Sequence, residues 1–540
     1  MNKNKTKNLN EQKKKTSIIT IILISILVVF IGIFIMSKKE DLDFDEILTF
    51  GLANNSFQLD IEDYKEYNGE ELLLQYAAVK EGETFNVENV FFNQKMDTHP
   101  PLYYLLVNFV SSIRKGTFSM WYGLIINLLF MLILFWEMRY LFNLLIKDNI
   151  MSTILSLISF FSYGFINELV FIRMYVMLSV ISMGFAILII KRMENYDNEK
   201  DKFSFPIAFF IICVIGILTQ YHFVVLAFYF SAIFGIFLIY KKDYKSLFIT
   251  FAAGVLSIAT AVLIFPQMIN HFFGEESLHA FNGSQIHSLS ERLYEIIFTV
   301  YRSFFGVGLI PYIIILLIAI ILLCRKSYKE KEKIKDGITQ NKLYFIILGC
   351  CIFYYLVIAF TVKYTFARYL YNIYPLIIIS LISSVYLLYK SLSPVLKYIS
   401  LFVVLMLVIT SRLNGEPFSL NAGHNEFHEY LNNNSGTKVL GLYRSLNAEG
   451  RMDAQNTSMW KLPRPLYSLR DMESISFVDL SKNDIILKND NLLKGNALFI
   501  LIYATEDDER ILNNIIETTD FANVSKVIDT TYYHMYRLSK

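Results

Sequence analysis

The sequence predicts a polytopic bundle of transmembrane helices followed by a small α/β domain. Two observations predict it. Of the 540 residues, 54% are hydrophobic and only 18% are charged, and the mean hydropathy is +0.42, which is too apolar for a soluble chain of this length. Apolar runs near the roughly 20 residues that a spanning helix requires also recur along most of the chain. The formal net charge of +2 excludes a nucleic-acid-binding protein, because such proteins carry a large basic excess.

Eleven apolar segments are predicted to span the membrane. The first follows a lysine-rich leader, residues 1–16, but lacks the small-residue cleavage site of a signal peptide, so we interpret it as a retained anchor. The predicted spans are 17–36, 118–141, 150–166, 169–190, 203–219, 223–240, 247–265, part of 296–324, 344–360, 370–389 and 396–409.

The distribution of basic residues gives the orientation. Segment 100–113 is apolar but shorter than a spanning helix, and we interpret it as an interfacial helix. The basic turns at Lys191-Arg192 and Lys241-Lys242 and the lysine-rich loop 325–342 then all face the cytoplasm, as the positive-inside rule requires. The sequence therefore predicts a multi-pass cell-membrane protein with a cytoplasmic N-terminus and an extracellular C-terminal domain.

The polar parts define the predicted domains. Residues 17–410 form the membrane domain, with an outer loop at 37–113, and 411–540 form a domain outside the membrane. Short apolar runs at 439–443, 497–503 and 524–538 predict strands, and 507–518 predicts a helix between two of them. This pattern indicates a small α/β domain.

The cysteines indicate no metal or redox site. All four, Cys213, Cys324, Cys350 and Cys351, lie in apolar segments. Their positions match neither a disulfide framework nor a zinc-ligand spacing. We therefore expect no metal site.

An acidic run follows the first span directly, with the residues Glu40, Asp41, Asp43, Asp45 and Glu46. A carboxylate at the mouth of a helical bundle can activate a hydroxyl group by accepting its proton. The alternative interpretation is that these acids are simply solvated.

A second candidate lies at the sequence Asp97-Thr98-His99-Pro100-Pro101. Proline is accepted in the first turn of a helix and keeps the preceding residue extended, so an acid and an imidazole stand at a rigid corner. The corner can also be structural, as the cap of an interfacial helix that places Tyr103 and Tyr104 in the aromatic belt.

Four cations stand on the predicted outer side, where the orientation rule does not require them: Arg173, Arg302, Lys363 and Arg368. Ionisable groups in or near spans are costly and are therefore candidates for function. Arginine is suited to phosphate because its planar fork can donate to two oxygens at once. The alternative is that each side chain extends to the interface only to keep its charge in water.

Several of these motifs occur together in an order that resembles a known family. They are Asp45-Glu46 after the first span, the Asp97 to Tyr104 corner, Arg173-Met174-Tyr175, Tyr221-His222 between two spans, and Arg368-Tyr369-Leu370 with Pro375. The chain, over residues 17–409, resembles the GT-C membrane glycosyltransferases, specifically glycosyltransferase family 39. That family includes the protein O-mannosyltransferases and the aminoarabinose transferases of lipid A.

The resemblance implies roles for these residues. Asp45 would be the catalytic base with Glu46 as its neighbour, Asp97 and His99 would belong to the donor-phosphate site, and Arg368 would contact the phosphate. Many relatives carry an acid two residues before the Arg-Met-Tyr step, where this chain has Phe171, and Glu168 lies further away. The resemblance also implies a lipid-linked donor, with no nucleotide sugar and no obligatory metal.

The sequence thus predicts an inverting sugar transferase at the outer membrane face. Its donor would be a polyprenyl-phosphate sugar, and its acceptor an envelope polymer, a lipid or a protein. A second hypothesis is a transporter or flippase of a lipid-linked sugar, but such carriers place charges near the bilayer midplane, whereas these candidates cluster at one face. A third is a non-catalytic envelope assembly protein that displays the C-terminal domain.

Overall fold

The protein folds into two compact units. The first, the membrane unit, comprises Met1–Lys39 and Leu124–Leu420, and the second comprises Glu40–Gly123 and Asn421–Lys540. The second is named the outer unit, because the sequence predicts that its segments lie outside the membrane. The computed structural model describes residues 2–56, 58–273, 289–301, 310–311, 313–314, 317–318, 320–321, 340–361, 367–392, 397–414, 417–421, 424–446, 459–481, 495–503, 508–530 and 532–540.

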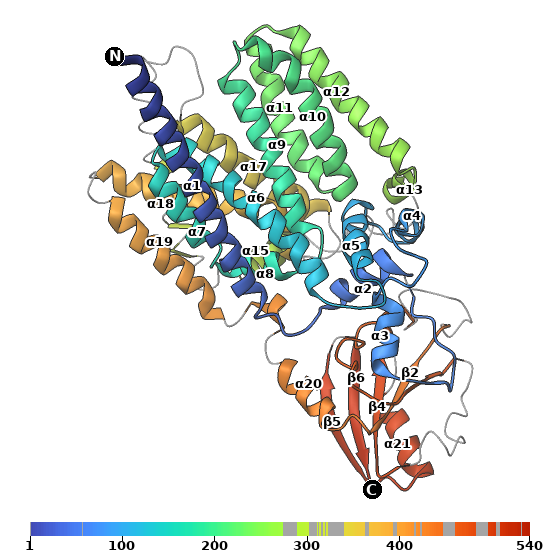
Figure 1. The fold of residues 1–540 in the computed structure, drawn as a ribbon. Helices are drawn as coiled ribbons and strands as arrows, with labels where there is room; N and C mark the ends of the chain where they lie inside the picture. The colour runs from blue at the N-terminus through green and yellow to red at the C-terminus, as the bar shows by residue number, and fades with distance from the viewer. Residues whose placement is uncertain are drawn as a thin grey trace. The chain divides into compact units, whose positions relative to one another are not determined.

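The membrane unit is helical. Among the described residues, eight helices are long and apolar enough to cross a membrane, or nine if the bent pair α7 and α8 counts as one span. In Figure 1, α9 to α12 form a group of neighbouring helices, and α10 packs against both α9 and α12. The helices of this unit are α1 (Asn2–Met36), α6 (Trp121–Ile146), α7 (Asn149–Ser159), α8 (Tyr163–Val170), α9 (Tyr175–Glu194), α10 (Glu199–Thr219), α11 (Phe223–Tyr240), α12 (Tyr244–Ile264), α13 (Met268–Phe273), α15 (Leu289–Val300), α17 (Gln340–Thr361), η3 (Ala367–Ile373), α18 (Tyr374–Leu392), α19 (Lys397–Ser411), η5 (Arg412–Asn414) and η6 (Phe418–Leu420).

The predicted spans at 150–166 and 169–190 have different boundaries in the structure. The chain bends by 68° between α7 and α8, and α9 begins only at Tyr175. At the bend, the hydroxyls of Ser159 and Ser162 donate to the carbonyls of Leu155 and Ser159, both at 2.7 Å. Serine hydroxyls that bond to nearby carbonyls compete with regular helix geometry, which accounts for a break that hydropathy does not indicate. The predicted span 296–324 lies mostly outside the described residues, and 396–409 corresponds to the 15-residue α19.

The outer unit combines a six-stranded sheet with short helices. Its helices are α2 (Phe44–Asn54), α3 (Gly69–Ala77), α4 (Val87–Met96), α5 (Leu102–Ile113), α20 (His424–Asn432), η7 (Met459–Lys461) and α21 (Asp508–Thr518). Its strands are β1 (Glu66–Tyr67), β2 (Lys438–Tyr443), β3 (Ile475–Asp479), β4 (Ala497–Tyr503), β5 (Asn523–Asp529) and β6 (Tyr533–Ser539). The predicted class, a membrane helical bundle with a small C-terminal sheet domain, is confirmed.

The sheet has the strand order β1-β3-β2-β4-β6-β5. Strand β2 is parallel to β3 and β4, whereas β1, β5 and β6 pair antiparallel with their neighbours. The inward residues of β2 and β4 alternate along each strand, and α21 contributes Leu512 and Ile515 to the same core. Strand β1 comes from the segment after the first span, so both parts of the outer unit contribute to one sheet.

Two features of the sheet differ from the sequence prediction. The predicted strand 524–538 is a hairpin of β5 and β6, because Thr530 ends β5 by donating from its backbone N–H (3.1 Å) and its hydroxyl (2.7 Å) to the carbonyl of Tyr533. Strand β3 was not predicted. It is only five residues long, and Ser476 and Asp479 interrupt any continuous apolar run, although all five residues are buried.

Candidate active site

The acidic segment after the first span leads into α2, and its acids have different environments. Asp43 is the N-cap residue, and its carboxylate accepts the backbone N–H of Asp45 at 3.0 Å. The carboxylate of Glu46 accepts the backbone N–H of Asp43 at 2.6 Å and is fully buried. The two form a capping box, in which each side chain satisfies a backbone donor at the helix start.

Asp45 differs from its neighbours because its carboxylate takes no part in this box. It lies in the first turn of α2 and is half-buried. Its own carbonyl accepts the hydroxyl of Thr49 at 2.7 Å, which fixes the first turn further. Of the two acids singled out from the sequence, Glu46 is thus committed to the cap, and Asp45 stands at a rigid helix start, where the N-terminal end of the helix dipole favours a negative charge.

Asp41 is buried. The sequence identifies it only as one member of the acidic run and predicts no separate role for it. Its Oδ2 accepts hydrogen bonds from His424 Nδ1 at 2.7 Å and Ser468 Oγ at 2.9 Å, and it lies 3.4 Å from His428 Nε2. Burial by itself would raise the pKa of Asp41, but the hydrogen bonds from His424 and His428 hold this pKa well below its usual range. Asp41 is therefore ionised, and the interpretation of the whole run as solvated is wrong for this residue.

The Asp97 corner has the geometry that the prolines predict. His99 Nδ1 donates to Asp97 Oδ2 at 2.9 Å, and the hydroxyl of Tyr104 lies 3.4 Å from the same oxygen. Pro101 is the N-cap of α5, and Asp97 ends α4. The structure thus brings Asp97 and His99 together as an oriented pair, with the imidazole 19% exposed.

In the membrane unit, Arg173 lies in the irregular step between α8 and α9. It is 3% exposed, so it does not extend to the interface as the alternative interpretation required. In the preceding helix, Glu168 is fully buried and accepts the hydroxyl of Ser179 at 2.5 Å, and the same hydroxyl lies 3.2 Å from the carbonyl of Tyr371. Glu168 therefore ties α8 to α9.

Arg368 is the second residue of the 3-10 helix η3 and is half-buried. Its guanidinium lies 5.7 Å from the ring centroid of Tyr369, and the ring of His222 lies 5.2 Å from the same ring, between centroids. Tyr221, the residue before His222, shares a hydrogen bond of 2.8 Å with Nδ1 of His271. Arg368 and His222 thus meet around one tyrosine. Two other candidates, Arg302 and Lys363, lie outside the described residues.

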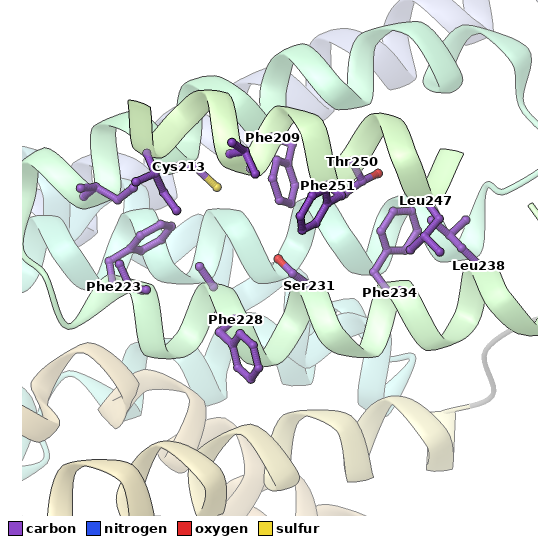
Figure 2. A pocket seen from close by; sticks show the side chains of 17 residues that line it. Phe209, Cys213, Phe223, Phe228, Ser231, Phe234, Leu238, Leu247, Thr250 and Phe251 are labelled. Atoms are coloured by element: carbon purple, nitrogen blue, oxygen red, sulfur yellow. The ribbon is translucent and has the colours of Figure 1, made fainter. Parts of the chain in front are cut away.

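An apolar cavity of about 300 Å³ lies between α10, α11 and α12 (Figure 2). Its walls are aromatic and aliphatic, with few polar atoms, and include Phe209, Phe223, Phe234 and Phe251. Phe223, the first residue of α11, directly follows His222 in the chain. The cavity suits a hydrocarbon chain better than a sugar.

The tail contributes residues that the sequence analysis missed. His424 and His428 are one helical turn apart on α20, a spacing that could have indicated a shared partner. No sequence spacing indicated the contacts of Arg464, because the three aromatic residues around it come from separate segments of the chain. They are Phe44, Trp460 and Tyr532. Within the described residues, no group of three or more His, Cys, Asp or Glu side chains could hold a metal ion.

Comparison with solved structures identifies the fold. ArnT from Cupriavidus metallidurans, solved bound to undecaprenyl phosphate, matches 97% of this chain and 98% of its own, with 10% identity and a TM-score of 0.51. The chain has the GT-C fold. The apo form of ArnT gives a TM-score of 0.48 at the same identity and coverage. An oligosaccharyltransferase from Archaeoglobus fulgidus, tethered to an acceptor peptide, gives 0.41, with 10% identity over 93% of this chain and 69% of its own.

The match to undecaprenyl-phosphate-bound ArnT confirms the fold that the resemblance implies. No protein-family model matches the sequence, and no curated protein matches it either. The GT-C fold of this chain is therefore detected by comparison of structures, although only 10% of the aligned residues are identical to those of ArnT.

Proposed function

We propose that this protein transfers one sugar from a polyprenyl-phosphate carrier to an acceptor hydroxyl at the outer face of the membrane, with inversion at the anomeric carbon. The observation that carries the proposal is the first turn of α2. There Asp45 is a half-buried carboxylate on a helix start that the capping box of Asp43 and Glu46 makes rigid. A general base must be held in a fixed position near the proton that it accepts, and Asp45 meets this requirement.

In the proposed reaction, Asp45 accepts the proton of the acceptor hydroxyl. The acceptor oxygen forms a bond to the anomeric carbon while the bond from that carbon to the phosphate oxygen breaks on the opposite face. The bonding electron pair leaves with the lipid phosphate. This is the geometry of an inverting displacement, in which a carboxylate activates the nucleophile at a carbon of oxocarbenium character.

The departing phosphate gains negative charge and requires cationic partners. We assign this role to Arg173 and Arg368, with Arg302 and Lys363 as further candidates from the sequence. Both described arginines are at least half-buried, and a partly desolvated guanidinium binds phosphate more strongly than an exposed one. His99 would donate to the donor, and Asp97 would orient its ring.

The cavity between α10, α11 and α12 supports a lipid-linked donor. Its aromatic walls can hold part of an isoprenoid chain, as an amphiphilic donor requires. One wall residue, Phe223, directly follows His222, whose ring packs against Tyr369. ArnT, which shares the fold, was solved with undecaprenyl phosphate.

The proposal is tested with purified protein in vesicles that contain a labelled polyprenyl-phosphate sugar. Transferase activity requires that acceptor addition releases the lipid phosphate and yields a glycosylated product of inverted anomeric configuration, which mass spectrometry and NMR detect. A transporter would move the labelled lipid between leaflets without release of lipid phosphate. Binding with neither release nor movement would favour a non-catalytic assembly protein.

A further inference from the structure

The short segment that leads to Asp45 is held at both ends by residues of the tail. At its start, the buried Asp41 carboxylate is bound by His424 and Ser468, and its backbone carbonyl accepts Asn421 Nδ2 at 2.8 Å. All of these residues belong to the outer unit. The position of Asp41 therefore depends on α20 and on the turn that contains Ser468.

At its other end, the segment is held through Phe44, the first residue of α2. The guanidinium carbon of Arg464 lies 3.4 Å from the ring centroid of Phe44, and its opposite face lies against the ring of Tyr532. Trp460 packs edge-on against Phe44, with 5.6 Å between the ring centroids. Arg464 is thus inserted between two aromatic rings and is only 8% exposed.

Burial of this cation disfavours its charged form and lowers the pKa of Arg464 to about 10, while Tyr532 and Asp43 act in the opposite direction. It therefore stays charged at neutral pH. A cation over an aromatic face is attracted by the negative charge of the ring face, and more strongly when it is desolvated. Arg464 consequently holds Phe44 in one position, and Phe44 is covalently joined to Asp45.

We propose that Arg464 is a positioning residue for Asp45, and that the tail is thereby part of the catalytic apparatus. This inference rests on the proposed role of Asp45 as the base. The capping box fixes the backbone of the first turn, but it does not fix the direction in which that turn faces. The stack of Arg464 on Phe44 fixes the direction of this turn. The hydrogen bonds of Asp41 fix the segment that precedes the turn.

The test compares the variants Arg464→Ala and Arg464→Lys with Arg510→Ala, which removes an exposed arginine from α21 of the same unit. A misplacement of about 1 Å in a reacting group can reduce a rate about a hundredfold. We therefore expect Arg464→Ala to reduce kcat by about tenfold to a hundredfold, with little change in the KM for the donor. Arg464→Lys should recover part of the loss, because an ammonium can still lie over a ring but cannot stack between two.

Chemical rescue separates positioning from general stability. Guanidinium at millimolar concentration should raise the kcat of Arg464→Ala towards the wild-type value and should leave Arg510→Ala unchanged, because only the first variant has a vacated space between two rings. A wild-type kcat per folded molecule in Arg464→Ala would overturn the inference. The inference would also be overturned if Arg464→Ala yields less folded protein, but the folded molecules have the wild-type kcat.

Two further variants, Phe44→Leu and Asp45→Asn, distinguish a failure of the positioning role from a failure of the proposed function. If Arg464→Ala does not fold, Phe44→Leu removes the stacked ring while retaining an apolar side chain, and it must show the same loss of kcat. If Asp45→Asn retains full activity, the proposed function fails. If Asp45→Asn is inactive while Arg464→Ala, Arg464→Lys and Phe44→Leu are fully active, only the positioning role fails.

Discussion

The Glu46 carboxylate accepts the backbone N–H of Asp43 at 2.6 Å, across the first turn of α2. This one contact separates two adjacent acids that are equivalent in the sequence. Glu46 is engaged with the backbone and shielded from solvent, so it cannot also reach a substrate hydroxyl. The Asp45 side chain projects in a different direction from the same turn.

Asp45→Asn should therefore abolish transfer without loss of fold or donor binding. Asparagine keeps the shape of aspartate but cannot accept a proton, and the removal of a general base commonly reduces a rate by about a hundredfold to ten-thousandfold. Glu46→Gln should retain most activity, because glutamine also completes a capping box. Turnover of a labelled polyprenyl-phosphate sugar measures both. Loss of activity in Glu46→Gln alone would assign the base to Glu46.

Arg368→Ala should weaken binding of the carrier lipid. Arg368 is half-buried beside Tyr369, so its removal deletes a charge without opening a core cavity. Arg368→Lys should restore only part of the affinity, because a point charge does not reproduce the two-pronged contact of a guanidinium with phosphate. Titration with polyprenyl phosphate in detergent measures the change, and Lys245→Ala, an exposed lysine of α12, is the control. Wild-type affinity in both Arg368 variants would place the phosphate elsewhere.

Filling the apolar cavity should discriminate between donors by chain length. Gly254 lines the cavity on α12, and a Cβ there would lie 3.8 Å from the ring of Phe209, so a side chain can enter. Gly254→Phe should raise the KM for a long-chain donor and leave the KM for a two-isoprene donor unchanged. Ala252→Phe adds the same ring to an exposed position of α12 outside the cavity and should change neither. Equal effects on both donors would exclude the cavity as the site of the chain.

The stability contributed by Asp41 should depend on pH in a defined direction. Its folded-state pKa lies below the value of about 3.9 for an unfolded aspartate, so its contribution is fully present above about pH 5. This contribution is lost as the pH falls through the lowered value. Thermal unfolding of wild type and Asp41→Asn should therefore differ most near neutral pH and converge in acid. A constant difference between pH 3 and 7 would show that the Asp41 charge contributes nothing.

The orientation can be checked with a single engineered thiol. Asn432 ends α20 and is exposed, and Asn432→Cys should react with an impermeant maleimide in intact cells. Cys213, Cys350 and Cys351 should contribute little background labelling, because they are buried, and the remaining cysteine, Cys324, is replaced by serine in the test protein. Labelling only after the membrane is opened would reverse the predicted topology.

Much of the fold follows from composition and periodicity. Long apolar runs determine where helices form in a membrane, and strands β2 and β4 are continuous apolar runs at the predicted positions. The break between α7 and α8 does not follow, because hydropathy is insensitive to whether a serine hydroxyl donates to a backbone carbonyl. The contribution of the early segment to the sheet does not follow either. Its strand β1 has only two residues, Glu66 and Tyr67, and is too short to be recognised from the sequence.

For the candidate site, local patterns sufficed only where the partners are close in sequence. Asp97 and His99 pair at the corner that the prolines predict. The capping box of Asp43 and Glu46 was not predicted, although these residues are only three apart. Arg464 lies more than 400 residues from Phe44, so their contact is a property of the tertiary fold. No local spacing rule can predict such a pair.

Strand β1 is paired antiparallel with β3, so Tyr67 lies opposite Ile475 at one edge of the sheet. At the adjoining start of α3, Gly69 packs so tightly on the tail that a Cβ there would overlap the carbonyl oxygen of Leu469. During synthesis, the ribosome makes residue 67 long before residue 475 exists, and every membrane span between them must be inserted first. The segment around β1 cannot complete its packing while most of the chain is still being translated. Its edge of the sheet can therefore form only after the strands of the tail have been made.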